Sequence, residues 1–436
     1  MKKYFLNLTW MLGDRVLMLV YQLFVFAAIK RIYDLDTLGA WSTINNLSQL
    51  LMSIFMLGID LIVIKKIIEN KDSAGKEIGS AIVVQIIGAM IYATIFYLII
   101  IFYYSNLERV MLYFWVFVVA NFFSIFAKSI FWHYNALLES KYRAITIITS
   151  ILISFGIMIV ITKYNPELIF YSYAIYYVIQ FSFSLLIYFI FFKQRSKWKF
   201  SSSSSLAYLK VGSKLMISTL SVAIFVQADT LMLEKLSGIK EVGIFSAALR
   251  VSSIWFFAAG VIASAFFPKI VAIKDKQDDS LFLLRWMTGC VLILSIFSAI
   301  FINLFGGKIL ELLYGGDMTE SSRVLSIHIW SGVFIFMGAF SSKWLYAHNE
   351  INLEIYKTLI AAVFNVIANF IVIPSYGAVG ASFVSLVSYF LANILFFAFV
   401  KRTRPVLFSQ LSSFRYLLSL KKFIKDCRRA RCLFQS

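Results

Sequence analysis

Long apolar runs recur along the whole chain and constrain its fold more than any other feature. Each run holds about 20 residues, enough to cross about 30 Å of hydrocarbon as a helix that rises about 1.5 Å per residue. The sequence is 61% hydrophobic and only 14% charged over 436 residues, with a mean hydropathy of +0.83. Because these values lie far outside the soluble range, we predict an all-α polytopic membrane protein.

We predict twelve transmembrane helices from the positions of these runs. The expected spans are residues 8–29, 40–64, 80–103, 110–132, 144–162, 168–192, 212–233, 244–267, 285–305, 323–345, 355–373 and 379–400. If both ends are inside, 30 Lys and Arg residues fall in inside segments and 7 in outside segments. Basic residues accumulate on the cytoplasmic side, so both termini are predicted to be cytoplasmic. This bias accounts for the net charge of +19 without nucleic acid as a partner.

The sequence contains an internal repeat, in which the second half resembles the first. Gly39-Ala-Trp41-Ser42 aligns with Gly243-Ile-Phe245-Ser246, and Trp132 after the fourth span resembles Trp344 after the tenth. The longest polar break follows the sixth span and contains the serine run 201–205. Since six is even, both halves enter the membrane in the same direction, as in a parallel repeat.

Four segments follow from this repeat. They are an N-terminal six-helix lobe (1–192), a flexible, basic, Ser-rich cytoplasmic linker (193–211), a C-terminal six-helix lobe (212–400) and a basic cytoplasmic tail (401–436). The N-terminus mimics a secretory signal, but Asp14-Arg15 interrupts it and the apolar pattern continues to Ile29, so we interpret it as an uncleaved first span. The tail is either an amphipathic helix on the anionic inner leaflet or a positive segment that serves topology only.

Polar residues form stripes on several expected spans. Asn46, Gln49 and Asp60 fall on one face of the second span, and Asn121 and Lys128 on one face of the fourth. Such Asn and Gln residues either contact a substrate or hold neighbouring helices together. Lys128 and Asp60 lie near the inner ends of their spans, where snorkelling explains them equally well.

Charged residues inside apolar runs need water, a partner or a ligand. We expect Arg15 and Arg250 to line a cavity, whereas Asp14 could pair with a basic neighbour, and His328 is expected to be packed rather than to relay protons. No nucleotide-binding loop, zinc spacing or nucleophile motif occurs, and three cysteines define neither a disulfide framework nor a metal site. The sequence therefore does not indicate an enzyme.

Three motifs resemble a known family. They are Asn365-x-x-x-Asn369-x-x-x-Ile373-Pro374-Ser-Tyr376-Gly377-Ala-Val-Gly380, the hairpin from Asp229 to Ala248, and Leu313-Tyr314-Gly315. They resemble signatures of the polysaccharide-transport (Wzx-type O-antigen flippase) family, within the multidrug/oligosaccharidyl-lipid/polysaccharide exporter superfamily. In the first motif Pro374 stops a helix, Gly377 permits a turn and Gly380 allows close helix approach. We therefore expect a structural role for Asn365, Asn369, Pro374, Gly377 and Gly380.

The resemblance implies two six-helix lobes around a central cleft in a bacterial inner membrane. It implies a flippase that moves oligosaccharide repeat units on undecaprenyl diphosphate, for O-antigen or capsule, from the cytoplasmic to the periplasmic leaflet by alternating access. Arg15 and Arg250 would bind the diphosphate. The expected sugar and head-group contacts are Asn46, Gln49, Asn121 and Lys128. Partners would be membrane lipids, a polysaccharide polymerase and a chain-length regulator.

The coupling ion stays open on this interpretation. Asp14, Asp60 or Asp229 would bind H+ or Na+, or coupling would be absent, and no other cofactor is expected. The alternative function is an ion-coupled multidrug antiporter of the same superfamily, in which the same three acids bind cationic drugs. A membrane glycosyltransferase or polymerase is a third possibility, but the chain lacks large loops with acidic catalytic residues.

Overall fold

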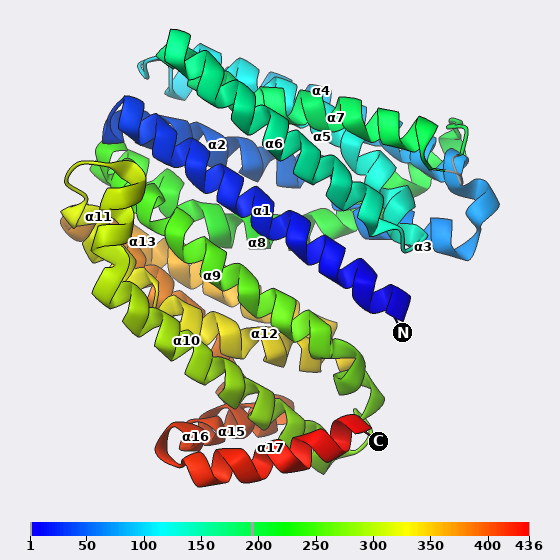
Figure 1. The fold of residues 1–436 in the computed structure, drawn as a ribbon, viewed down its shortest axis with the longest axis vertical. Helices are drawn as coiled ribbons and strands as arrows, with labels where there is room; N and C mark the ends of the chain where they lie inside the picture. The colour runs from blue at the N-terminus through cyan, green and yellow to red at the C-terminus, as the bar shows by residue number, and fades with distance from the viewer. Residues whose placement is uncertain (1, 193–195, 436) are drawn as a thin grey trace. The chain divides into compact units, whose positions relative to one another are not determined.

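The computed structural model describes residues 2–192 and 196–435 (Figure 1). Nearly all of these residues are helical, and the described part contains no strand. The chain forms two compact units, residues 1–227 and 228–436. The boundary lies inside the long helix α8 (Ser202–Ser237), because the second unit begins at residue 228 rather than at residue 212, where the C-terminal lobe was expected to begin.

The first unit is a helical bundle whose central member is α5. Figure 1 shows α4, α5, α6 and α7 running beside one another. The helices are α1 (Lys2–Ile32), α2 (Leu35–Phe55), α3 (Asp60–Glu69), α4 (Ala74–Tyr103), α5 (Val110–Ala136), α6 (Ser140–Tyr164) and α7 (Tyr171–Ile190). Asp34 caps α2 by accepting a hydrogen bond from the Thr37 amide at 2.7 Å. That amide lowers the pKa of the Asp34 carboxyl.

The second expected span is broken between α2 and α3. Leu57 and Gly58 both adopt positive φ, and the two helices meet at a 43° bend. Non-glycine residues rarely occupy this region, so Leu57 marks a position that the surrounding packing holds. Side-chain space at Gly58 is closed, because a Cβ there would lie 2.9 Å from the Thr219 Cγ2 of α8.

The described part of the expected linker is fixed rather than flexible. The Lys199 amide donates to the Gly75 carbonyl at 3.0 Å, and the Ser201 amide donates to Ser80 Oγ at 3.0 Å. Helix α8 then begins at Ser202, and its Tyr208 hydroxyl donates to the buried Glu77 carboxylate at 2.6 Å. Serine runs suggest solvated chain, but here they bond to α4 and start a helix. Residues 193–195 lie outside the described part.

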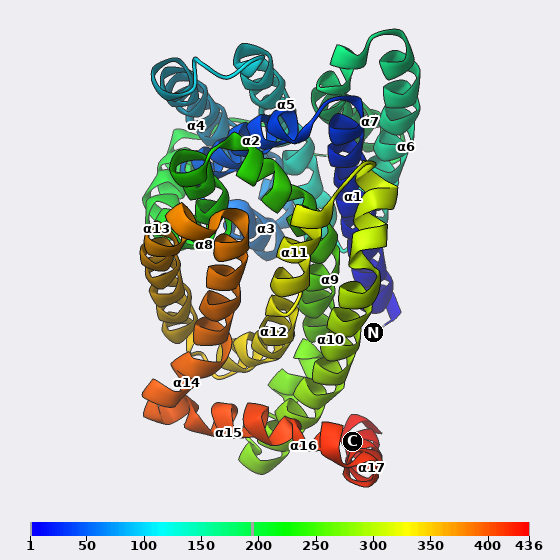
Figure 2. The same ribbon diagram turned by 90° about the vertical axis from the view of Figure 1, so that its left-hand side faces the viewer.

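The second unit contains the remaining helices and the tail. They are α9 (Ile239–Ala272), α10 (Gln277–Tyr314), α11 (Thr319–His328), α12 (Ser331–Ala347), α13 (Ile351–Phe390), a π-helical turn at 391–395, α14 (Phe396–Phe399), α15 (Arg404–Ser413), α16 (Arg415–Leu418) and α17 (Leu420–Gln435). Figure 2 shows α15 and α16 lying across the ends of the long helices of this unit. An apolar core of α9, α10 and α12 residues extends to Val406 of α15.

Helix α13 consists of two segments that meet at Gly377, where φ is +50°. Asn365 Nδ2 donates to Ser388 Oγ at 3.4 Å, although 23 residues of straight helix would span roughly 35 Å. The two segments therefore fold back beside each other. They match the separate eleventh and twelfth spans that the sequence predicts.

The helix lengths and hydropathies confirm a polytopic all-α membrane protein. Eight helices of the described residues are long and apolar enough to cross a membrane, or nine if α2 and α3 form one bent span. Most expected spans fall on one helix or on one segment of α13, whereas residues 40–64 cover α2 and α3 and residues 323–345 cover α11 and α12. The total of twelve is compatible with this arrangement and stays a prediction.

Equivalent aromatic residues of the two sequence repeats make equivalent contacts. Trp41 packs against Tyr113 of α5 with ring centroids 5.4 Å apart, and its counterpart Phe245 packs against His328 of α11 at 6.1 Å. In both cases a helix near the start of its repeat contacts the helix two spans later. These contacts are compatible with the repeat inferred from the sequence, which stays a prediction.

Candidate functional site

Asp229 lies at the centre of a buried polar cluster in the second unit. Its side chain is in the last third of α8, and the residue is only 6% exposed. Asn369 donates to Asp229 Oδ1, and Ser385 donates to Oδ2. Asn369 also donates to Asn365 Oδ1 at 3.1 Å. The cluster thus joins α8 to both segments of α13.

The charge of Asp229 has no basic partner in the described part of the chain. Its hydrogen bonds come from a neutral amide and a neutral hydroxyl. The Asn369 Oδ1 atom is also buried and accepts no hydrogen bond. A buried carboxylate is costly unless it is paired, protonated or bound to a cation. The oxygen atoms of Asp229, Asn365, Asn369 and Ser385 are the ligand type that a proton or a hard cation prefers.

The hairpin that carries Asp229 also fixes the turn of α13. Ser237 Oγ donates to the Ile373 carbonyl at 2.9 Å, and the Ala378 amide donates to Glu241 Oε2 at 2.7 Å. Gly377 has positive φ, and a Cβ there would collide with the Glu241 carboxylate. Hydrogen bonds between residues 136 and 137 positions apart therefore join the two motifs into one structural unit.

The other members of the first motif have local roles in this turn. Pro374 lies within α13, one turn before Gly377. A Cβ on Gly380 would lie 2.8 Å from both Val372 Cγ1 and Tyr376 Cβ. The glycine therefore packs on the residues just before the turn.

Asp14 in the first unit is partnered, unlike Asp229. Arg143 Nε of α6 lies 3.0 Å from Asp14 Oδ2, with side-chain exposures of 12% and 0%. Arg15 is its neighbour in sequence and is exposed. The sequence allowed a basic partner for Asp14 without identifying Arg143. One sequence feature could have pointed to Arg143, because Tyr142-Arg143 occupies the same place in the first half as Tyr356-Lys357 in the second. In the structure Lys357 is likewise buried in an ion pair, with Glu354 at 2.9 Å.

The polar stripes of the first unit mostly bond neighbouring helices. Asn121 Nδ2 donates to Ser48 Oγ and to the Tyr92 hydroxyl, each at 3.0 Å, which joins α2, α4 and α5. Gln49 donates to the Tyr173 hydroxyl at 3.5 Å. The remaining two positions differ in burial, since Asn46 is half-buried and Lys128 is exposed.

Asp60, Arg250 and His328 also interact with side chains of the described part of the chain. The Trp132 indole donates to Asp60 Oδ1 at 2.7 Å. Arg250 is half-buried and interacts electrostatically with Tyr314. His328 is buried beside Ser252 Oγ, 2.9 Å from its Nδ1, which confirms that this histidine is packed.

Comparisons with known proteins place this architecture. A family model described as polysaccharide biosynthesis protein matches residues 1–274. The chain is 29% identical over 174 residues to capsular polysaccharide biosynthesis protein CapF of Staphylococcus aureus, which covers 39% of this chain and 44% of the relative. It is 27% identical over 158 residues to the probable low-salt glycan biosynthesis flippase Agl15 of Haloferax volcanii, covering 35% and 33%. The matches thus span less than half of each relative.

Solved structures resemble the fold over nearly the full length. Lipid II flippase MurJ in an inward closed conformation has a TM-score of 0.70 at 14% identity, covering 98% of this chain and 97% of that chain. An outward-facing MATE family multidrug resistance transporter of the MOP superfamily has a TM-score of 0.66 at 14% identity, covering 96% of both chains. At these identities the likeness shows the fold alone.

The fold is therefore that of the MurJ and MATE membrane transporters. Because the family model covers more than half of the sequence, the chain belongs to the polysaccharide biosynthesis protein family. The resemblance inferred from the three motifs is confirmed at this level.

Proposed function

We propose that this chain is a flippase for lipid-linked oligosaccharides. In this proposal it moves repeat units on undecaprenyl diphosphate, of O-antigen or capsule type, from the cytoplasmic to the periplasmic leaflet by alternating access. The observation that carries the proposal is the family match over residues 1–274, combined with a fold like that of a lipid flippase over 98% of the chain. Both termini would be cytoplasmic, in agreement with the distribution of basic residues.

The polar residues suit an anionic, sugar-bearing head group. Arg15 and Arg250 carry fixed charges that would bind the diphosphate. Asn46 and Gln49 carry amides that would bond to sugar hydroxyls. Asn121 already bonds to two hydroxyls, so its primary contribution would be to position α2 and α5.

The multidrug antiporter receives less support from the site. That alternative requires acids that attract cationic drugs. Asp14 is neutralised by Arg143 at 3.0 Å, and Asp60 accepts a hydrogen bond from Trp132 at 2.7 Å. Asp229 is the acid that lacks a cationic partner among the described residues, but it is only 6% exposed and already accepts hydrogen bonds from Asn369 and Ser385.

Asp229 is the residue that we propose for ion coupling. A proton or Na+ at its carboxylate would compensate a buried negative charge. Both segments of α13 contact this carboxylate through Asn369 and Ser385. Binding and release of the ion would therefore change how tightly α8 and the two segments are held together.

The test of the transport function is genetic complementation in the source organism. The gene is deleted, and surface polysaccharide and lipid-linked oligosaccharide are measured with wild type, Arg15→Ala, Arg250→Ala and the exposed control Lys308→Ala at matched membrane levels. We expect wild type and control to restore polymer. The two arginine variants should lose polymer and accumulate lipid-linked oligosaccharide. Normal polymer in the deletion strain would exclude the function.

A further inference from the structure

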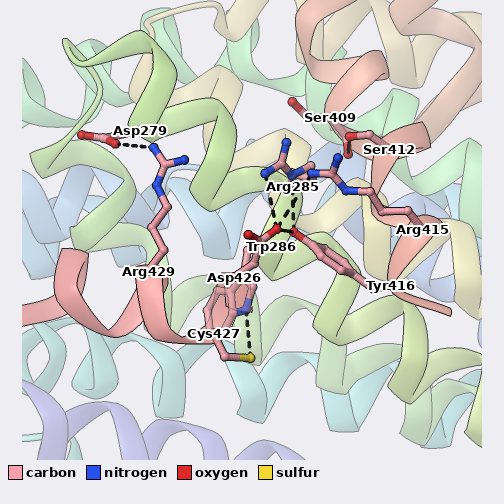
Figure 3. A network of polar contacts seen from close by, with 10 residues as sticks. All are labelled: Asp279, Arg285, Trp286, Ser409, Ser412, Arg415, Tyr416, Asp426, Cys427 and Arg429. Carbon is pink, nitrogen blue, oxygen red and sulfur yellow. Dashed lines mark hydrogen bonds and ion pairs between the residues drawn. The ribbon is translucent and has the colours of Figure 1, made fainter. Parts of the chain in front are cut away.

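The C-terminal segment from residue 401 to 435 lies at one end of α10. Helix α10 has 38 residues, so it is roughly 57 Å long and exceeds the hydrocarbon thickness of about 30 Å. The segment contacts the first turns of this helix, which include Asp279, Arg285 and Trp286 (Figure 3). The chain reaches this position directly after α14, the end of the last apolar stretch. The segment is therefore placed at a membrane boundary.

A polar network fixes α17 on α10. Asp426 Oδ2 accepts a hydrogen bond from the Tyr416 hydroxyl at 2.6 Å and lies 3.5 Å from Arg285 Nη2. Arg429 pairs with Asp279 at 3.2 Å, and the Trp286 indole donates to Cys427 Sγ at 3.4 Å. Burial and the bond to Asp426 raise the pKa of Tyr416, which keeps it a proton donor. Figure 3 shows Arg285, Tyr416 and Asp426 meeting at one point, with the Arg429–Asp279 pair to one side.

The opposite face of α17 is strongly basic. Lys421, Lys422, Lys425 and Arg428 are all exposed, and none of them forms an ion pair with another described residue. Their spacing of i, i+1, i+4 and i+7 puts them on one side of the helix. Ala430, on the docked side, is fully buried. Like charges at this spacing repel one another, so the face is poised for an anionic partner.

Exposed apolar side chains precede this basic face. Phe408 is 66% and Leu411 49% exposed on α15, where they lie three residues apart, and Leu418 at the end of α16 is 89% exposed. Val406 of α15 and Tyr416 of α16 are buried. The segment therefore exposes both apolar and cationic side chains. Apolar side chains suit the acyl region of a bilayer and cations suit the phospholipid head groups, so this combination fits the boundary between the two. An acidic soluble protein would satisfy the cations but not the exposed apolar side chains.

We propose that residues 401–435 form an interfacial platform that binds anionic phospholipid head groups. The cations of α17 contact lipid phosphates, and Phe408, Leu411 and Leu418 enter the outer acyl region. The network around Asp426 holds the platform rigidly on α10. This inference uses the membrane class of the protein and does not depend on the oligosaccharide cargo.

The experiment uses the exposed Cys432 of α17 as the site of a spin label. The full chain carries Cys290→Ala and Cys427→Ser, the latter to keep a hydrogen-bond acceptor for the Trp286 indole. It is placed in phosphatidylcholine nanodiscs with increasing phosphatidylglycerol. We expect the label to become less mobile as the anionic lipid increases, and high salt should weaken the effect. Lys425→Gln should weaken the binding constant for the anionic surface about fivefold, so the response should begin at a higher phosphatidylglycerol fraction.

Two multiple variants make the test specific. Replacing Lys421, Lys422, Lys425 and Arg428 together by Gln should abolish the response to phosphatidylglycerol. Replacing four exposed lysines elsewhere should leave the response unchanged; these are Lys71, Lys76, Lys210 and Lys276. Unchanged label mobility in pure phosphatidylcholine shows that α17 of the first variant is still docked.

Two outcomes would overturn the proposal. One is a label that is equally mobile in both lipid compositions, which would leave an acidic protein as the class of partner for this face. The other is an equal loss of response in both multiple variants, which would assign the effect to total charge.

Discussion

Replacing Asp229 by Asn separates a coupling role from a structural one. Asp229 accepts two hydrogen bonds from neutral donors, each worth about 1.5–3 kcal/mol when the acceptor is charged. Their sum, roughly 3–6 kcal/mol, is comparable to the penalty of several kcal/mol for burying the ion. Without a bound cation, the hydrogen bonds of the ionised carboxylate therefore roughly cancel the cost of burying its charge. Asp229→Asn keeps the shape and should change the free energy of unfolding by no more than about 1 kcal/mol.

The effect of the same substitution on cation binding is much larger. A unit charge 4 Å from the ion contributes about 4 kcal/mol at an effective dielectric of 20, which is roughly a thousandfold in affinity. In wild type, a cation at one hundred times its Kd should stabilise the fold by about 2.7 kcal/mol. For a domain of the size of the second unit, this corresponds to roughly 5–10 °C in Tm.

The assay is thermal unfolding of purified protein as Na+ is titrated at several pH values, alongside polysaccharide complementation. Wild type and the exposed-acid control Asp275→Asn should gain stability with the coupling cation and support transport. Asp229→Asn should fold with the Tm of cation-free wild type, show no cation response and fail to transport. Normal transport by Asp229→Asn across the pH range would refute a coupling role for this carboxylate.

Three further substitutions test the packing that positions the site. Gly377→Ala should lower the unfolding free energy by about 1–3 kcal/mol, because Gly377 has positive φ and lies against the Glu241 carboxylate. The control Gly260→Ala, with open space around it, should not lower this free energy. Thermal unfolding of the two variants compares them. Arg143→Ala should cost about 3–5 kcal/mol by leaving a buried carboxylate unpaired, and adding Asp14→Asn should recover part of the loss in a double-mutant cycle. Tyr208→Phe should cost about 1–3 kcal/mol and speed trypsin cleavage between residues 196 and 201; an unchanged cleavage rate would show that this bond does not fasten the segment.

Helix positions were the most predictable part of the fold. Hydrophobic length and polar breaks place most expected spans on one helix, because hydrocarbon thickness sets the length of a spanning helix. The break after Phe55 was not predictable, since Leu57 adopts positive φ and only its packing against α8 explains why. Similarly, the serine run predicted a flexible linker, whereas bonds to α4 from residues far away in sequence fix it.

The sequence singled out Asp229, Asn365 and Asn369 but neither their arrangement nor Ser385, which also bonds to Asp229. The sequence assigned Asp229 to coupling and Asn365 and Asn369 to structure, on separate helices with no sign that they meet. Bringing them together requires the fold-back of α13 at Gly377, which depends on Glu241. Arg143 was missed as the partner of Asp14 because a basic residue near a span end is ordinarily explained by topology.

The central claim is tested most directly by lipid translocation in a purified system. The chain is reconstituted into liposomes that carry a fluorescent undecaprenyl-diphosphate oligosaccharide in both leaflets, and a membrane-impermeant quencher is added outside. We expect the protected inner-leaflet signal to disappear with wild type and to persist with Arg250→Ala and with empty liposomes. A protected signal that persists with correctly folded wild-type protein, under every ion gradient applied, would contradict the assignment as a flippase.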